Sequence, residues 1–216
     1  ILKKPYIEYE KLHKEYINAS SSVLEIGAGT GLFTKSLLDS GAKVVATDIS
    51  PHSLKVIRKR FADYQQKLIV QVADMEKLPF NKNYFDIVTC AGSLSYGDND
   101  LVMNEISRVL KPGGVFICVD SLNENPLYKF NRWLNYKRGR RSLGTLTNMP
   151  TISLIEKYNT NFELISINFH GALVWIYPFL KVLIGKIYAT KIIDKYDGLN
   201  KTRRSAFKFV MVVKKN

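Results

Sequence analysis

The chain of 216 residues is 46% apolar, which suits one globular domain with a sizeable core. It lacks a run of about 18 apolar residues and is not predicted to cross a membrane, and its charged N-terminal residues do not resemble a signal peptide, so a cytoplasmic location is expected. The 32 basic and 19 acidic residues give a net charge of +13, which favours polyanionic partners such as nucleic acid, anionic lipid headgroups or phosphorylated substrates.

The first part of the chain alternates helical and strand patterns. A helix is predicted over residues 5–18, with an aromatic face that packs on the core or covers a ligand. Strands are predicted at residues 23–26, 43–47, 68–72, 84–90 and 115–119, and the helices between them at residues 30–40, 51–61 and 100–110. This alternation predicts a parallel sheet with helices on both faces.

The second part of the chain is less regular. Residues 124–141 are expected to form a helix followed by a basic run, and residues 152–158 a short helix. Strands are predicted at 162–170 and 205–213, and the strongly apolar stretch 172–188 lies between them. The basic residues of the first segment are Lys129, Arg132, Lys137, Arg138, Arg140 and Arg141.

The two cysteines and three histidines give no metal signature. Cys90 and Cys118 lie in apolar strand patterns, which predicts buried reduced thiols. Neither has the spacing to a histidine that metal ligands need, so no metal site is predicted. His13 and His52 are expected on helix surfaces.

Three glycines spaced two apart follow the first strand. Gly27, Gly29 and Gly31 predict a tight turn with positive φ angles, after which the first N–H groups of a helix are free to bind a ligand. Glu25 lies inside the strand before them, where a carboxylate is costly to bury unless a cation or a hydrogen-bond donor meets it.

Polar residues also follow the other predicted strands. Asp48, Asp74, residues 93–98 and residues 120–123 come where strands end. Ligands of parallel α/β sheets bind at the carboxyl ends of the strands. The sequence therefore predicts a ligand site at this edge of the sheet.

The glycine pattern discriminates between two nucleotide cofactors. The dinucleotide fingerprint G-x-G-x-x-G has a glycine in the sixth place, where this chain has Leu32. Glu25 ahead of the turn disfavours a pyrophosphate but tolerates a cationic ligand such as a sulfonium amino acid. The pattern G-x-G-x-G over Gly27–Gly31 therefore favours the sulfonium compound.

With these features the chain resembles the class I S-adenosylmethionine-dependent methyltransferases, in their small-molecule, methyltransferase-11-like branch. The motifs lie in residues 20–120 and are Val23–Gly31, Asp48, Ala73-Asp74, the strand Phe85–Val88 and Leu110–Gly114. The resemblance implies an α/β fold with a Rossmann-like, seven-stranded, mostly parallel sheet and helices on both faces. It also implies an antiparallel last strand between strands five and six.

The same resemblance implies a single methyltransferase domain over residues 1–216. This domain would comprise an N-terminal helix (1–20), a cofactor-binding half (21–120), substrate-side insertions around strand six (121–204) and the last strand (205–216). The insertion between strands six and seven leaves and returns at the cofactor edge, so we expect it to cover the substrate site.

The resemblance assigns the glycine turn to the methionine part of S-adenosyl-L-methionine. Gly27, Gly29 and Gly31, with Ala28, would line this part of the cofactor. Glu25 would lie near the cofactor's ammonium group or order the loop.

The resemblance assigns the adenosine part to the later strand ends. Asp48 would accept hydrogen bonds from both ribose hydroxyls, and Ile49 would pack on the adenine. Asp74 would bind the adenine amino group, Met75 would lie beside the ring, and Cys90-Ala91 would offer backbone contacts. The alternative for both aspartates is helix capping or turn chemistry.

A base is needed if the methyl acceptor is a hydroxyl group. His170, at the end of a parallel strand on the cofactor edge, is the preferred catalytic candidate, and a structural histidine is the alternative. Tyr96 is a second catalytic candidate, and Asp120 and Asn123 are further ones.

Nucleic acid is disfavoured as the acceptor despite the charge. The chain has Ala91-Gly92-Ser93-Leu94 where base and glutamine N-methyltransferases carry N/D-P-P-Y, and it lacks the Pro-Cys nucleophile of cytosine C5 methylation. The basic run also lacks the pattern of an RNA-binding module.

The apolar stretch 172–188 leaves three interpretations open. Its aromatic residues and lysines suit a membrane interface, a buried lid or a homodimer contact. The second half is also loosely similar to methyltransferases of polysaccharide biosynthesis, so a sugar or lipid-linked glycan hydroxyl is the expected acceptor. The alternatives are an RNA-associated methyltransferase and a non-catalytic S-adenosylmethionine-binding module.

Overall fold

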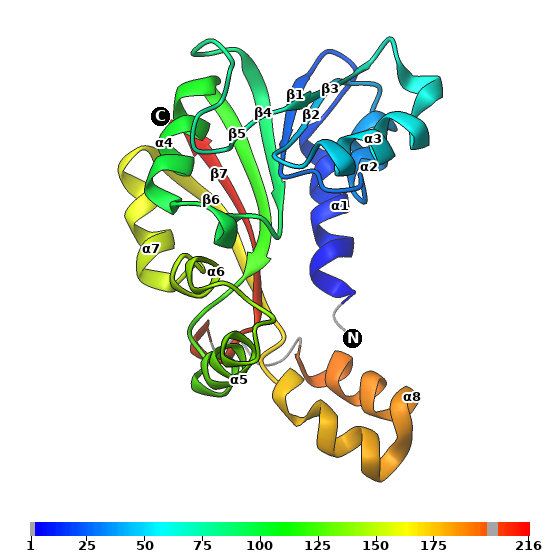
Figure 1. Cartoon of the computed structure of the whole chain (residues 1–216), viewed down its shortest axis with the longest axis vertical. Helices are drawn as coiled ribbons and strands as arrows, with labels where there is room; N and C mark the ends of the chain where they lie inside the picture. Colours follow the sequence, from blue (N-terminus) through cyan, green and yellow to red (C-terminus); the bar gives the residue numbers. More distant parts are fainter. Residues whose placement is uncertain (1–2, 198–202) are drawn as a thin grey trace.

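The computed structural model describes residues 3–197 and 203–216. Its centre is a seven-stranded sheet in the order β3-β2-β1-β4-β5-β7-β6 (Figure 1). Every neighbouring pair is parallel except the two that include β7, which is antiparallel to β5 and β6. The strands are β1 Ser22–Ile26, β2 Lys43–Asp48, β3 Leu68–Val72, β4 Phe85–Ala91, β5 Leu110–Ser121, β6 Phe162–His170 and β7 Lys208–Lys215. The predicted fold class, with the antiparallel last strand between strands five and six, is confirmed.

Helices cover both faces of this sheet because its central strands are apolar on both sides. The helices are α1 Lys4–Tyr16, α2 Thr34–Leu38, α3 Pro51–Arg60, α4 Asn99–Val109, α5 Pro126–Lys137, α6 Leu143–Thr147, α7 Ile152–Lys157 and α8 Tyr177–Asp197. One core lies between the sheet and α1, α2 and α3, and the other between the sheet and α4 and α7. Alternate residues of β5 serve the two cores, with Phe116 in one and Ile117 in the other.

Two element boundaries differ from the sequence prediction for physical reasons. The helix predicted from residue 30 begins only at Thr34, because Gly31 has a φ of 79° and holds the chain in a turn. The strand predicted from residue 115 begins at Leu110, because Leu110 already pairs with Phe85, the first residue of β4.

His13 is not on a helix surface, and that prediction is wrong. Its side chain is fully buried under α2, and its Nδ1 lies 2.7 Å from the Ser36 hydroxyl. Burial lowers the pKa of His13 to about 3, so the ring is neutral at physiological pH. His52 is exposed, as predicted.

The predicted basic run is also smaller than expected, because Arg132 is buried. Its Nη1 donates hydrogen bonds to the Leu122 carbonyl (2.8 Å) and to Asn123 Oδ1 (3.0 Å), and its guanidinium lies over the Phe207 ring. Arg132 therefore fixes α5 to the end of β5. The exposed remainder, called the basic segment below, is Lys129, Lys137, Arg138, Arg140 and Arg141.

The apolar stretch 172–188 forms a protruding hairpin rather than part of the central core. Helix α8 is broken at Gly185 (φ 77°, ψ 164°), which gives two arms, residues 177–184 and 186–197. The hairpin extends away from the sheet at the edge where β5 and β6 end (Figure 1). Among the described residues, we find no helix that combines the length and the apolar character needed to span a bilayer.

Candidate cofactor site

The glycine turn after β1 has the conformation that its sequence predicts. Gly27, Gly29 and Gly31 have φ angles of 61°, 54° and 79°, in the left-handed region that favours glycine. A Cβ on Gly27 would overlap the Ser93 side chain, whereas no atom lies within 4 Å of the position that a Cβ on Gly29 would take. The turn is therefore closely packed at Gly27 and open at Gly29.

Asp48 joins the glycine turn to the end of β2. Its Oδ2 accepts a hydrogen bond from the Gly29 N–H (2.8 Å), and its Oδ1 accepts one from the Ser50 N–H (2.8 Å). The Ser50 side chain in turn caps α3. Each carboxylate oxygen keeps a free lone pair, so Asp48 can accept further hydrogen bonds from a ligand.

A cavity of about 440 Å³ opens at the carboxyl ends of β1, β2, β3 and β4. Eight of its lining residues were predicted as site residues, and these are Gly27, Gly29, Asp48, Ile49, Asp74, Met75, Ala91 and Tyr96. The remaining ones are Ala73, Glu76, Gly92, Ser93 and Gly97. For Gly92, Ser93 and Gly97 the signal was the stretch after the fourth predicted strand, and for Ala73 and Glu76 it was the Ala73-Asp74 motif after the third; both pointed to the region rather than to these side chains.

Four predicted cofactor residues do not line this cavity. Ala28 donates its N–H to the Thr47 carbonyl (2.9 Å) and so holds the turn against β2. A Cβ on Gly31 would lie 2.8 Å from the Phe61 ring, so this glycine allows α3 to pack closely. Cys90 is buried in β4, and Glu25 lies in β1 beneath the turn.

Glu25 is a buried carboxyl group that supports the turn. Its Oε2 accepts a hydrogen bond of 2.5 Å from the hydroxyl of Thr34, the first residue of α2. Burial, together with the nearby charge of Asp48, raises the pKa of Glu25 to about 7, although the Thr34 hydrogen bond lowers it. The contact with Thr34 agrees with the expected role of ordering the loop.

We expect Glu25→Gln to make the protein more stable at alkaline pH. The folded-state pKa is about 7 against a reference of 4.5, so the stability that Glu25 contributes is complete below about pH 4.5 and is lost as pH rises through 7. The neutral amide avoids this loss of about 3 kcal/mol in the free energy of unfolding. Its oxygen can still accept the hydrogen bond from the Thr34 hydroxyl. Urea unfolding of both proteins at about pH 5 and about pH 8 measures it.

The matched control for this prediction is Glu15→Gln, which changes an exposed carboxyl group of α1. This variant is expected to follow the wild-type pH dependence. If the gap between wild type and Glu25→Gln is the same at both pH values, Glu25 does not titrate with a raised pKa.

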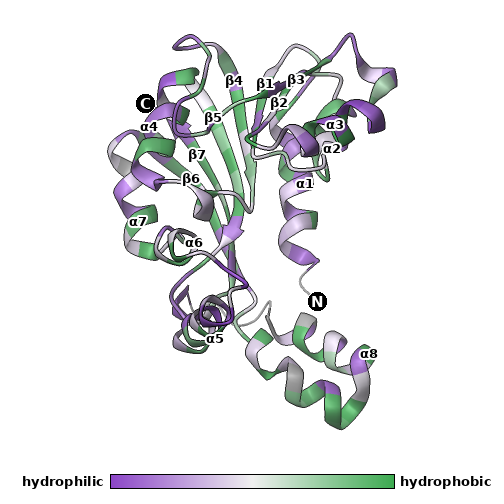
Figure 2. Cartoon of the chain, viewed as in Figure 1, coloured by the Kyte–Doolittle hydropathy of each residue, from purple (hydrophilic) through white to green (hydrophobic). Residues whose placement is uncertain are grey.

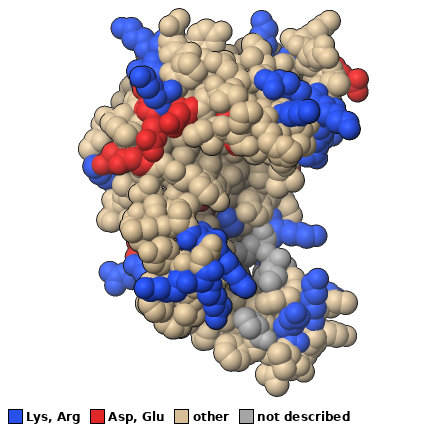
Figure 3. All heavy atoms as spheres, viewed as in Figure 1, with Lys and Arg blue, Asp and Glu red and all other residues tan. Residues whose placement is uncertain are grey.

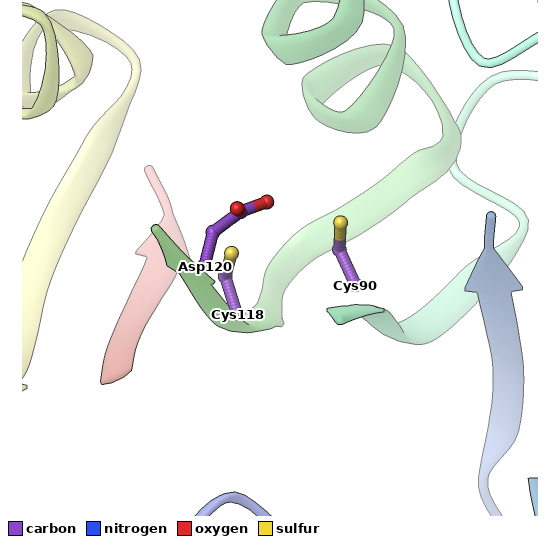
Figure 4. Close-up of side chains that lie close together, drawn as sticks. All are labelled: Cys90, Cys118 and Asp120. Atoms are coloured by element: carbon purple, nitrogen blue, oxygen red, sulfur yellow. The ribbon is translucent and has the colours of Figure 1, made fainter. Parts of the chain in front are cut away.

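Two thiols and a carboxyl group lie close together near the carboxyl ends of β4 and β5 (Figure 4). Cys90 and Cys118 are register partners on β4 and β5, both free and buried, as predicted, and Asp120 lies beside them. Burial and the neighbouring Cys90 thiol raise the pKa of Cys118, and burial raises that of Asp120. Asp120 Oδ2 accepts the Leu94 N–H (2.9 Å) and so fixes the turn after β4.

The two predicted catalytic residues lie in different surroundings. Tyr96, in a short 3₁₀ turn after β4, lines the cavity and is 71% exposed. His170 does not line it, because its Nε2 lies 2.8 Å from Glu8 Oε2 of α1. The structure therefore brings Tyr96 to the cavity and His170 to a contact with Glu8 at the end of β6.

The first half of the chain is similar in sequence to known proteins. The family model described as a methyltransferase domain matches residues 24–118. The chain is 36% identical over 132 residues to a sterol 4-C-methyltransferase of Caenorhabditis elegans, which covers 56% of this chain and 40% of the relative. It is 38% identical over 126 residues to a ubiquinone/menaquinone biosynthesis C-methyltransferase of Chromobacterium violaceum. This match covers 56% of this chain and 52% of that protein. The matches thus span about half the length of these curated relatives.

The whole chain also shares its fold with solved structures. One is the geranyl diphosphate C-methyltransferase of Streptomyces coelicolor, in complex with Mg²⁺, geranyl diphosphate and S-adenosyl-L-homocysteine. The TM-score is 0.71 at 16% identity, over 100% of this chain and 81% of that one. At 16% identity the comparison concerns the fold alone. Because it covers the whole chain, it shows that the second half shares this fold as well.

Proposed function

The chain carries the domain of the class I S-adenosylmethionine-dependent methyltransferases, and on this premise we propose that it methylates a small, lipid-soluble acceptor. The observation that carries the proposal is the cavity at the ends of β1, β2, β3 and β4, where Gly29, Asp48 and Asp74 meet. The family of this domain uses S-adenosyl-L-methionine as its methyl donor.

The cavity residues fit this cofactor. The open side of Gly29 leaves room for the methionine part, and Asp48 keeps acceptor capacity for the two ribose hydroxyls. The 70% exposed side chain of Ile49 and that of Met75 offer apolar walls for the adenine, with Asp74 as the acceptor for its amino group. Buried Glu25 would act by ordering the turn through Thr34.

When bound, the cofactor supplies an electrophilic methyl group on a positively charged sulfur atom. The protein then contributes mainly by holding the acceptor in line and by excluding water. Tyr96 is the catalytic candidate at the cavity, where its hydroxyl can donate a hydrogen bond to a polar group of the acceptor. His170 could act as a base only after leaving Glu8.

A lipid-soluble acceptor is favoured by two independent observations. The named relatives act on a sterol and in quinone biosynthesis, and both are apolar ring compounds. At the same edge of the sheet, the α8 hairpin exposes large apolar side chains. Together they support a peripheral enzyme that takes its acceptor at a membrane surface.

A sugar hydroxyl on a lipid-linked glycan is the second candidate. The basic segment supports it, because exposed lysines and arginines at the acceptor edge suit the phosphates of such a lipid. Two alternatives remain. An RNA-associated methyltransferase would transfer methyl groups to RNA, and a non-catalytic binding module would transfer none.

A transfer screen with labelled methyl groups tests these proposals. The purified chain is incubated with S-adenosylmethionine and, in separate reactions, with a quinone precursor, a sterol, a polyprenyl-phosphate-linked sugar and total RNA. Label in the quinone or sterol supports the main proposal, and label in the sugar or RNA supports the corresponding alternative. If calorimetry shows that the cofactor binds but no acceptor is labelled, the result supports the non-catalytic binding module.

A further inference from the structure

The α8 hairpin exposes more large apolar side chains than a surface element of a monomer usually does. Exposed fractions reach 86% for Val182, 78% for Leu183, 69% for Ile187, and 66% for both Phe179 and Tyr188. All five lie within six residues of the bend at Gly185. They form the tip of the hairpin, which is called the apolar tip below.

The apolar tip has no place in the hairpin's own core. That small core is already made by Tyr177, Ala189 and Ile193, with Val174 and Leu180 packed against it. Figure 2 shows apolar segments along both arms of α8, interrupted by polar ones. Exposed apolar side chains gathered in this way mark an interaction surface, so the apolar tip is expected to have an external partner.

Basic side chains surround the apolar tip. Lys181, Lys186, Lys191 and Lys195 are exposed along the hairpin. Figure 3 shows basic side chains over both lower parts of the molecule, where α5 and α8 lie in Figure 1. Helix α5 repeats the combination, because Phe130 (59% exposed) and Trp133 (44% exposed) stack beside its basic residues. Apolar and cationic groups are thus displayed together on two elements at one end of the molecule.

This mixture fits a bilayer better than a protein partner. The cores of protein interfaces are depleted of lysine, whereas here lysines alternate with the apolar side chains. At a membrane interface the apolar side chains enter the acyl boundary and the lysine stems reach up to the phosphates. A net charge of +13 adds attraction to anionic headgroups.

We propose that the α8 hairpin docks the protein on an anionic lipid bilayer, with the apolar tip inserted at the interface and the hairpin lysines and basic segment on the headgroups. β5 and β6 end at the same edge as the strands that form the cavity, so docking here presents the acceptor side to the lipid. The docking of α8 on a bilayer is independent of the proposed function. Only the statement that the acceptor comes from the lipid rests on that function.

The test is co-sedimentation of the full chain with vesicles. The wild type is expected to bind vesicles of equal parts phosphatidylcholine and phosphatidylglycerol, to bind phosphatidylcholine alone much less, and to lose affinity as salt rises. The triple variant V182S/L183S/I187S is expected to bind the anionic vesicles at least about tenfold more weakly. The charge variant K181E/K186E/K191E is expected to lose the preference for anionic lipid.

A matched control makes the same chemical change elsewhere on the surface. The variant I69S/V72S/L101S alters exposed apolar residues of β3 and α4 and is expected to bind vesicles as the wild type does. Circular dichroism of every variant checks that the helices remain. Should α8 itself unfold in the triple variant, tryptophan fluorescence of L183W in the wild-type background provides a second readout, with a blue shift expected on anionic vesicles.

Three results would overturn the proposal. They are equal vesicle binding by V182S/L183S/I187S and wild type, no binding of the wild type to anionic vesicles, and a wild-type dimer in analytical ultracentrifugation that the triple variant abolishes. The last result would assign the apolar tip to a second copy of the chain. Methyl transfer to an acceptor in detergent is independent of docking, so it shows whether the proposed function or this inference has failed.

Discussion

Asp48→Ala is expected to weaken the binding of S-adenosylmethionine by about 100-fold or more. The proposed binding mode has two hydrogen bonds from ribose hydroxyls to the Asp48 carboxylate, and their loss costs about 1.5 kcal/mol or more each, where a tenfold change corresponds to about 1.4 kcal/mol. The variant also removes the acceptor of the Gly29 and Ser50 N–H groups, which loosens the turn that faces the cofactor. Isothermal titration calorimetry with S-adenosylmethionine and S-adenosylhomocysteine measures the loss.

Two further variants make the Asp48 experiment decisive. Asp63→Ala removes an exposed carboxyl group just after α3 and should leave the affinity unchanged. Asp48→Asn keeps the shape of the side chain and serves if Asp48→Ala does not fold. Wild-type affinity in a folded Asp48 variant would show that the ribose does not bind at the end of β2.

Gly29→Val is expected to abolish detectable cofactor binding while the protein stays folded. The new side chain would enter the open space beside the turn, which the cofactor needs. A residue with a Cβ at a φ of 54° costs about 1–2 kcal/mol of stability, which a domain of this size tolerates. Thermal unfolding and calorimetric titration, done on the same preparation, separate the two effects.

Gly31→Ala is the matched control, because it has the opposite expected profile. Its Cβ would lie 2.8 Å from the Phe61 ring and 3.1 Å from Ile57, so the strain falls on the packing of α3 rather than on the cavity. We expect a larger loss of stability than in Gly29→Val, with cofactor affinity largely kept in the folded fraction. The reverse pattern would mean that Gly31, not Gly29, faces the cofactor.

The strands and the cavity of the first half of the chain were predictable because their signals are local. Strand, glycine turn and following aspartate each occupy a few consecutive residues, and the backbone converts them into a site at the ends of parallel strands. The same kind of local signal predicts the helix at residues 51–61, and α3 begins at Pro51, where the Ser50 side chain accepts the Ser53 N–H. The position of β7 in the sheet is not encoded in local sequence patterns. It was predicted from the resemblance to a family and not from the residues of the strand itself.

The misplaced residues depend on contacts that are distant in the sequence. His13 is buried because Ser36, on another helix, meets its ring. Arg132 looks like its basic neighbours in the sequence, yet the carbonyl of Leu122 and the ring of Phe207 draw it inward. The apolar pattern of residues 172–188 was clear, but hydropathy does not say whether protein, lipid or ligand covers a segment.

The position of β7 has a consequence for how the chain assembles during synthesis. β1 to β5 can pair as soon as they leave the ribosome, but β6 has no neighbour until β7 arrives, because β7 alone lies between it and β5. Until then β5 presents an unpaired edge over Val115–Ser121, one of the most apolar stretches of the chain, as a template for intermolecular pairing. The nascent protein is therefore most exposed to aggregation between the emergence of β5 and that of β7, which makes this interval the one in which a chaperone would matter.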